Sequence, residues 1–260
     1  MPLQKLAFKP GVNRENSRYT SEGGWYECDK VRFRQGTPEK IGGWERISSE
    51  TFLGLCRKLF AWITLTGQKL LGVGTNLKYY IEKGGAYYDI TPLRATVSLT
   101  NPFTTVSGSA VVTVADAAGG YIDGDFVTFS GSSAVGGLTI TGEFQITKDT
   151  SANTYTITFT SAASSSATGG GSVTAKYQIN VGPETWAPLV GWGAGTWGIG
   201  TWGVGGTSTD SFRHYSQGNF GEDLIFGPRG GAPYYWDIST KTLGTDRAVA
   251  LSAISGASNA

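Results

Sequence analysis

Hydrophobic and polar residues alternate over many short stretches of this chain, and a period of two is typical of β-strands with one buried face. Residues 30–34 (KVRFR) place basic side chains between apolar ones. Residues 35–38 (QGTP) combine Gly and Pro and predict a turn. Because no 3.6-residue period stands out nearby, we expect residues 1–50 to be an N-terminal segment of strands and extended chain.

Residues 51–94 predict a β-meander. Apolar, β-branched runs at residues 59–66 (LFAWITLT) and 69–75 (KLLGVGT) are followed by a hairpin pattern at residues 77–90 (LKYYIEKGGAYYDI). Four strands joined by tight turns within about 40 residues have the size of one blade of a β-propeller. A meander inside a β-sandwich would give the same pattern.

Residues 95–182 predict a separate, Ser/Thr-rich module. Turn clusters separate five candidate strands, which span residues 110–115, 126–130, 138–147, 155–160 and 172–178. Alternation along YTITFT should turn Tyr155, Ile157 and Phe159 toward a core and the threonines toward water. This spacing is typical of a small β-sandwich or barrel, inserted into the surrounding meander.

A pattern of an apolar pair, Gly, a short turn and Tyr-Tyr occurs on both sides of the module. Aligning Tyr79 with Tyr234 also aligns Gly72 with Gly227. The pattern therefore suggests a repeated unit, with a second propeller-like meander at residues 211–260. The intervening residues 183–210 form a Gly/Trp-rich arm.

Composition and charge narrow the possible classes of protein. The 260 residues include 39 Gly, only 16% charged residues and a net charge of +1, which argues against a polyanionic partner for the chain as a whole. Residues 1–60 carry 11 Lys and Arg against 7 Asp and Glu, whereas the module carries 2 against 5. Two cysteines do not make a disulfide scaffold, and no apolar run reaches the length of a membrane span. We expect an all-β fold.

The arm is the most unusual sequence in the chain. Trp192, Trp197 and Trp202 recur every five residues and are flanked by glycines. The glycines match the G-x-G-x-x-G pattern of dinucleotide-binding turns, but the helix that such a site needs cannot form through continued Trp-Gly repeats. Trp is a frequent anchor at protein interfaces. We therefore predict that these three indoles lie at an interface between subunits; burial in the core of their own domain is the alternative.

Residues for catalysis are scarce. His214 is the single histidine, and no nucleophile elbow, metal-ligand cluster or suitably spaced carboxylate pair is present in the sequence. We therefore expect no enzymatic activity, no catalytic residues, no metal site and no cofactor.

Three stretches resemble the tail nozzle (packaged-DNA stabilisation, or tail-hub) proteins of short-tailed bacteriophages. They are residues 8–44 (FKPGVNRENSRYTSEGGWYECDKVRFRQGTPEKIGGW), the arm GWGAGTWGIGTWG at residues 191–203, and residues 219–237 (NFGEDLIFGPRGGAPYYWD). The resemblance implies a structural virion protein, made in the host cytoplasm, with a β-propeller fold. It further implies a homohexameric ring below the portal or adaptor protein, near tail fibres or spikes, that retains packaged DNA and conducts it on ejection.

If the basic N-terminal segment lines the channel, Lys30, Arg32 and Arg34 are the candidate residues for non-specific contact with passing double-stranded DNA; a solvated strand face is the plainer interpretation. The chain outside residues 95–182 is too short for a closed propeller of four to eight blades. We expect either a fragment of a longer nozzle or a sheet completed by neighbouring subunits or a second polypeptide.

An adhesin or glycan-binding β module, on a phage or a cell surface, is the alternative function. In that case the paired aromatics of the meanders would stack on sugars, namely Tyr79, Tyr80, Tyr87, Tyr88, Tyr234, Tyr235 and Trp236. Aromatic pairs on hairpins more often pack across strands than bind sugars.

Overall fold

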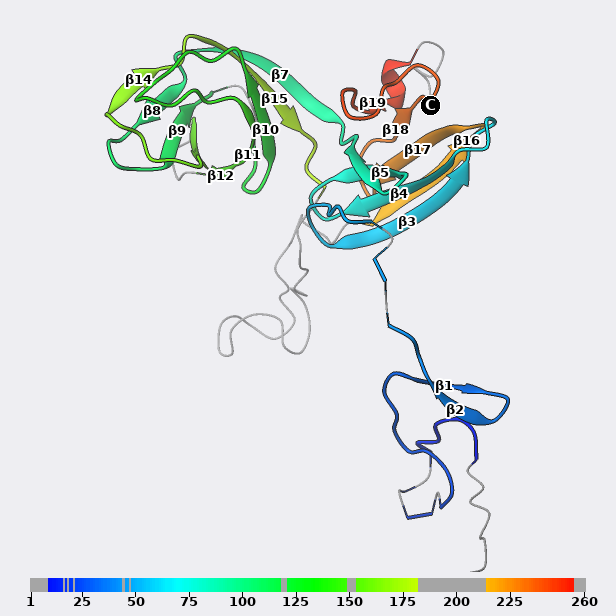
Figure 1. Ribbon diagram of the computed structural model, residues 1–260. Coiled ribbons are helices and arrows are strands. Elements are labelled where there is room, and N and C mark those ends of the chain that lie inside the picture. Colours follow the sequence, from blue (N-terminus) through cyan, green and yellow to red (C-terminus); the bar gives the residue numbers. More distant parts are fainter. Residues whose placement is uncertain are drawn as a thin grey trace, which may run out of the picture. The chain divides into compact units, whose positions relative to one another are not determined.

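The computed structural model describes residues 9–254 except residues 16, 18, 21, 44, 47, 118–120, 149–152 and 182–213. Within these residues the regular elements are β-strands and one short 3-10 helix, η1 (Leu251–Ala253), so the prediction of an all-β chain is confirmed there (Figure 1). None of the described residues belongs to a helix long and apolar enough to cross a membrane. Contacts divide the chain into two compact units, Met1–Ser49 and Glu50–Ala260.

The N-terminal unit contains one antiparallel hairpin, formed by β1 (Val31–Arg34) and β2 (Thr37–Lys40). Its turn consists of Gln35 and Gly36, with φ angles of 50° and 80°. Positive φ at both positions is typical of a type I′ turn, whose twist matches that of the flanking strands. The predicted four-residue turn is wrong in length, because β2 already begins at Thr37.

The second unit begins with a four-stranded antiparallel sheet, named here the first meander. Its strands β3 (Cys56–Ile63), β4 (Lys69–Thr75), β5 (Tyr79–Lys83) and β6 (Ala86–Asp89) pair in chain order. The predicted hairpin between β5 and β6 is confirmed. Its turn residues Gly84 and Gly85 have φ angles of 61° and 92°, which side chains with a Cβ rarely adopt.

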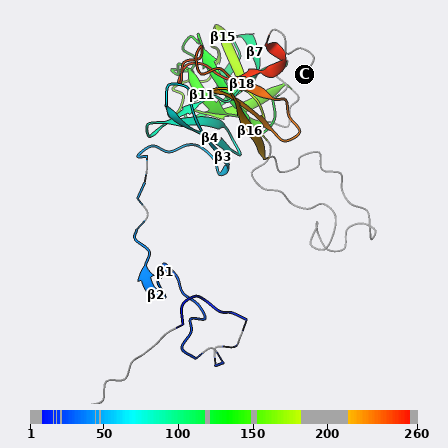
Figure 2. The ribbon, with the colours of Figure 1, turned by 90° about the vertical axis from the view of Figure 1, so that its right-hand side faces the viewer.

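A second meander follows the arm and repeats the same strand order. It consists of β16 (Tyr215–Phe220), β17 (Asp223–Pro228), β18 (Tyr234–Trp236) and β19 (Val249–Ala250). Figures 1 and 2 show the two meanders stacked. Their facing side chains form one core, which includes Trp62, Leu70, Tyr79, Ile81, Tyr215, Leu224, Phe226 and Trp236. The two meanders thus form two stacked sheets, and the described residues contain no closed propeller.

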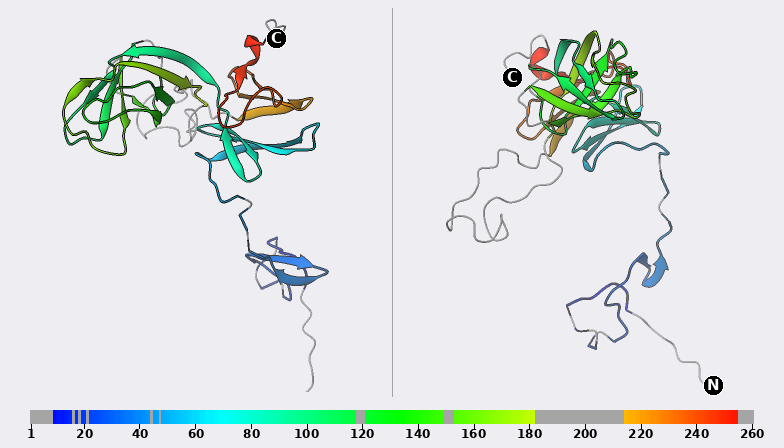
Figure 3. Two further views of the ribbon diagram at one scale, coloured as in Figure 1. Left: turned by 45° about the horizontal axis from the view of Figure 1, so that its top comes forward. Right: turned by 90° about the vertical axis from the view of Figure 1, so that its left-hand side faces the viewer.

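Between the meanders in sequence is a module of two antiparallel sheets that share a separate core, the arrangement of a small β-sandwich (Figure 3). The sheet orders are β11-β10-β15-β7 and β12-β13-β9-β8-β14. The strands are β7 (Leu93–Thr100), β8 (Phe103–Thr105), β9 (Val111–Ala115), β10 (Phe126–Ser130), β11 (Gly142–Gln145), β12 (Thr147–Lys148), β13 (Thr154–Thr158), β14 (Ala167–Gly169) and β15 (Ser172–Gln178).

Most predicted strands of the module are present, with one correction. Tyr155 and Ile157 are fully buried and Phe159 packs against the same core, as the alternation predicted. The single strand predicted at residues 138–147 is wrong. The structure divides it into β11 and β12, which belong to different sheets, because the chain crosses from one sheet to the other at buried Ile146.

The strand register does not preserve the repeat seen in the sequence. Tyr79 pairs with Gly74, whereas Tyr234 pairs with Phe226. Gly72 and Gly227 therefore do not occupy equivalent positions relative to the two tyrosines. The connection between β17 and β18 is longer than that between β4 and β5, which shifts one strand against its neighbour.

Candidate interaction surfaces

The predicted DNA-facing residues Lys30, Arg32 and Arg34 lie on or next to β1, and all three are exposed. Arg32 and Arg34 are two positions apart on one strand, so both project from the same face of the hairpin. Arg32 Nε donates a hydrogen bond to Glu39 Oε2 on β2, at 3.1 Å. Because this carboxylate offsets one cation, the face is less basic than the sequence of β1 indicates.

The other face of the hairpin holds it against the rest of the N-terminal unit. Val31 and Phe33 are half-buried there. The ring of Phe33 meets the indole of Trp25 edge to face, with 6.0 Å between centroids. Trp25 in turn forms a β-bridge with Val12. The hairpin thus has one apolar face that packs and one charged face that is open to a partner.

Trp192, Trp197 and Trp202 lie outside the described residues. Their predicted place at a subunit interface stays a prediction.

The outer face of the first meander, which points away from the shared core, is apolar. Register places Leu59 beside Val73 and Ala61 beside Leu71, so these side chains share that face. Leu59 and Ile63 expose 56% and 60% of their surface. A sheet with one solvated face normally carries polar residues there. This face instead exposes apolar side chains on β3, while Lys69 and Glu82 are the charged residues on β4 and β5 that share it.

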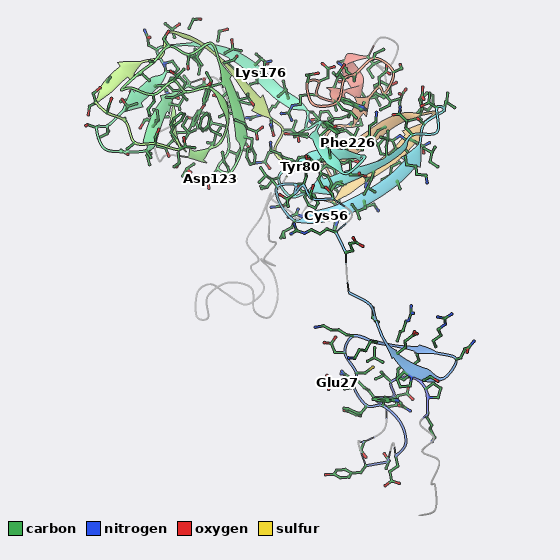
Figure 4. The ribbon with its side chains drawn as sticks, in the orientation of Figure 1. Glu27, Cys56, Tyr80, Asp123, Lys176 and Phe226 are labelled. Atoms are coloured by element: carbon green, nitrogen blue, oxygen red, sulfur yellow. The ribbon has the colours of Figure 1, made fainter. Side chains whose placement is uncertain are left out.

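Part of that outer face is covered by the chain that enters the unit. Phe52 packs against Tyr80 and Tyr87, with ring centroids 6.1 and 5.1 Å apart. The backbone N–H of Leu53 donates to the Tyr80 hydroxyl at 3.2 Å. Figure 4 marks Tyr80 on the first meander and Phe226, a core residue, on the second. Val73 on β4 is also buried on this face, so the covered part includes β4 to β6, whereas the side chains of Leu59 and Ile63 on β3 are exposed among the described residues.

The outer face of the second meander is also apolar. Paired positions place Gly218, Ile225, Tyr235 and Val249 in one row across all four strands. Phe220 lies on the same face and exposes 72% of its surface. A Cβ on Gly218 would meet no atom within 4 Å, so this end of the row is open. Asp223, paired with Phe220, is the charged residue of this face. The stack of two sheets therefore exposes apolar side chains on each outer side.

A charged cluster joins the module to the first meander. The Lys78 ammonium, almost fully buried, contacts Asp89 Oδ2 at 2.8 Å and also forms an ion pair with Glu143 of β11. Arg247 reaches the same two carboxylates, at 2.5 Å from Asp89 and 3.7 Å from Glu143. Gln178 Nε2 donates to Glu143 at 2.6 Å. Two cations shared by two carboxylates leave the cluster close to neutral and fix the position of the module.

The pKa values of the carboxyl groups here shift in opposite directions. Burial by itself would raise the pKa of Asp89, but the charges of Lys78 and Arg247, with hydrogen bonds from Lys78 and Thr91, lower it below its usual range. Burial raises the pKa of Asp125, at the base of the module, despite hydrogen bonds from Ile122 and Asn180 and the nearby Arg94. These shifts have structural causes and do not indicate an acid–base pair.

Three of the seven aromatic residues proposed for sugar stacking are buried, and the other four are half-buried. Tyr79 and Trp236 are fully buried in the core shared by the meanders, and Tyr80 is nearly so. Tyr88 lines a surface cleft of about 530 Å³ with Lys83 and Lys241. The remaining lining residues are Gln68, Gly84, Ile238, Thr242 and Leu243. This lining lacks the carboxylate pair that glycoside hydrolysis requires.

Among the described residues, no group of three or more His, Cys, Asp or Glu side chains could hold a metal ion. His214 is exposed, as is Cys56, and Cys28 is half-buried in the other unit.

No protein-family model matches the chain, and no curated protein matches it by sequence. Among solved structures, phage phi92 endosialidase is similar at a TM-score of 0.31 and 16% sequence identity. The match covers 82% of this chain and 32% of the endosialidase chain, so this chain spans about a third of that protein's length. Similarity at this level assigns neither a fold family nor a function.

Sequence reasoning missed the two apolar outer faces and the charged cluster. The sequence did indicate the outer face of the first meander, because LFAWITLT is apolar at both odd and even positions, as in strands buried on two sides. Lys78, Asp89, Glu143 and Arg247 carry no such signal, since they are far apart in sequence and only folding brings them together.

Proposed function

We propose that this protein is a structural subunit of the tail of a short-tailed phage, and that copies of it form the ring-shaped nozzle that retains packaged DNA and conducts it on ejection. The proposal rests on the three stretches that resemble nozzle proteins. The observation that carries it in the folded chain is the stack of two four-stranded meanders, each of which exposes large apolar side chains on its outer face. Such a stack buries all its apolar surface only when further sheets extend it.

In this proposal each meander is one blade of a propeller-like assembly. Each has four strands in chain order, and the two are packed face to face, as neighbouring blades are. Closure needs more blades than two, so neighbouring subunits or further polypeptide would supply them. The inserted module would then lie on the outside of the ring.

The proposed partners are other copies of the chain, the portal or adaptor protein above, and tail fibres or spikes. Contact with DNA is expected to be weak and independent of sequence, since tight binding to phosphates would retard ejection. The near-neutral chain and the Arg32–Glu39 pair are in keeping with this expectation.

Electron microscopy of the purified recombinant chain and of phage particles tests the proposal. Rings on the tail axis below the portal are expected, and a binding assay against a panel of glycans should give no specific ligand. Monomers at all concentrations, absence of the protein from the tail axis, or saturable glycan binding by the monomer would contradict a nozzle; the last result would favour the adhesin.

A further inference from the structure

At each end of the meander stack, the outer sheet face exposes large apolar side chains. One end is the outer face of the first meander, where Leu59, Ala61 and Ile63 are exposed along β3. The other is the outer face of the second meander, with Phe220 and the row that runs from Gly218 to Val249. These faces point in opposite directions from one core, so a single chain cannot bring them together.

We propose that the outer face of the first meander of one copy docks on the outer face of the second meander of another copy. This contact rests on the proposed function only in that we expect its repetition to close a ring. The contact would continue the sheet-on-sheet packing that already joins the two meanders within each chain. Because the two faces differ, the interface is heterologous, and its repetition generates a ring or an open filament.

The packing inside the chain shows how such faces fit. Tyr215 lies over Gly74, where a Cβ would overlap its ring, so an aromatic ring of one sheet fills the space left by a glycine of the other. The outer faces offer the same combination. Leu59 and Ile63 stand out from the first meander, and the second meander presents Gly218 with open space above it.

The charges at one edge of each face are complementary. Lys69 lies beside Ile63 on the first outer face, and Asp223 lies beside Phe220 on the second. Docking of unlike faces brings a cation and a carboxylate to the same rim.

Two variants that each block one face test the proposal. Ile63→Asp places a charge on the first outer face and Phe220→Asp on the second. Both positions are largely exposed, so the monomer is expected to fold, which circular dichroism and thermal unfolding would check. The matched control is Val111→Asp, an exposed valine on β9 of the module. Analytical ultracentrifugation would report assembly.

Each blocking variant alone is expected to be monomeric, with self-association weakened at least about tenfold, while the control assembles like the unmodified chain. An equimolar mixture of the two variants is expected to form dimers but no rings, because one intact pair of faces remains between unlike copies. That complementation is specific to a heterologous interface.

Rings that persist in both variants would overturn this interface while the proposed nozzle stands. Failure of the unmodified chain to assemble would overturn both. Variants that are monomeric but do not complement each other would also overturn the pairing of unlike faces. If Phe220→Asp still assembles, while Ile63→Asp and an arm variant with Trp192, Trp197 and Trp202 changed to Ser are each monomeric but complement each other, the arm occupies the first outer face. The proposed contact between sheets is then wrong.

Discussion

The rings of Tyr79 and Phe226 stack with 3.8 Å between centroids and an interplanar angle of 20°, and they join the first meander to the second. Tyr215 meets the same Tyr79 ring edge to face at 5.1 Å. Aromatic pairs of this kind contribute beyond the surface they bury. The Tyr215 ring fits beside Tyr79 because Gly74 has no side chain to occupy that space.

Gly74→Ala should destabilise the meander stack by about 1–3 kcal/mol, because the new methyl group would overlap the Tyr215 ring in a packed core. Chemical denaturation followed by tyrosine and tryptophan fluorescence would measure the loss. The control is Gly169→Ala in β14, whose Cβ would meet only Val135 at ordinary contact distance. Equal stability of the two variants would contradict the packing described for the meanders.

Lys78→Met should lower the free energy of unfolding by about 3 kcal/mol. This is the lower end of the range for removing one partner of a buried ion pair, because Arg247 still faces both carboxylates. The control is Arg32→Ala, which removes the exposed pair with Glu39 and should cost about 0–1 kcal/mol. If the Lys78 variant loses no more stability than the Arg32 variant, the charged cluster does not anchor the module.

The pH dependence of unfolding should separate Asp89 from Asp125. The pKa of Asp89 is lowered in the folded protein. Its contribution to the free energy of unfolding is therefore present above the usual pKa of 3.8 and is lost as pH falls through the folded pKa. Asp89→Asn should therefore reduce the loss of stability on acidification below pH 3.8. Denaturant titrations from pH 2 to pH 6, about the span in which carboxyl groups titrate, would measure it.

Asp125→Asn should act in the opposite sense. The pKa of Asp125 is raised, so the folded state holds the proton more tightly, and stability is lost as pH rises from 3.8 through the folded pKa. Removing the carboxyl group should abolish that decline in stability above pH 3.8 and leave the loss of stability below pH 3.8 unchanged. The same response to pH in both asparagine variants would contradict the opposite shifts.

The N-terminal hairpin should supply most of the weak affinity for double-stranded DNA. Combined replacement of Lys30, Arg32 and Arg34 by Ala should lower the slope of log affinity against log salt by about 2–3, since each phosphate contact contributes about 0.9. Fluorescence anisotropy at several salt concentrations would measure it. Replacing three exposed lysines elsewhere, Lys58, Lys83 and Lys176, gives a control of equal charge that should leave the slope unchanged.

Charge reversal at the same hairpin positions tests the channel in the particle. It should impair genome retention or infectivity if the hairpin lines the path of the DNA. Unchanged retention and infectivity would remove these residues from the channel.

The local sequence pattern was sufficient to predict the structure wherever neighbouring residues determine it. The Gly84-Gly85 turn, the strands at Lys69–Thr75 and Phe126–Ser130, and the inward orientation of Tyr155 and Ile157 follow from turn chemistry and a period of two. Prediction failed where a strand changes sheets. Residues 138–147 look continuous in sequence, and only the position of Ile146 between two sheets divides them.

The sequence by itself determined an all-β chain, its main turns and most of its strands, because alternation and glycine placement act over a few residues. Only the tertiary structure decided that the two meanders share a core and that Lys78, Asp89, Glu143 and Arg247 meet. It also decided that large apolar side chains are exposed on the outer face of each meander. Those relationships depend on strand register and on packing between distant segments. Such contacts form, and stabilise the protein, only when the whole unit is folded.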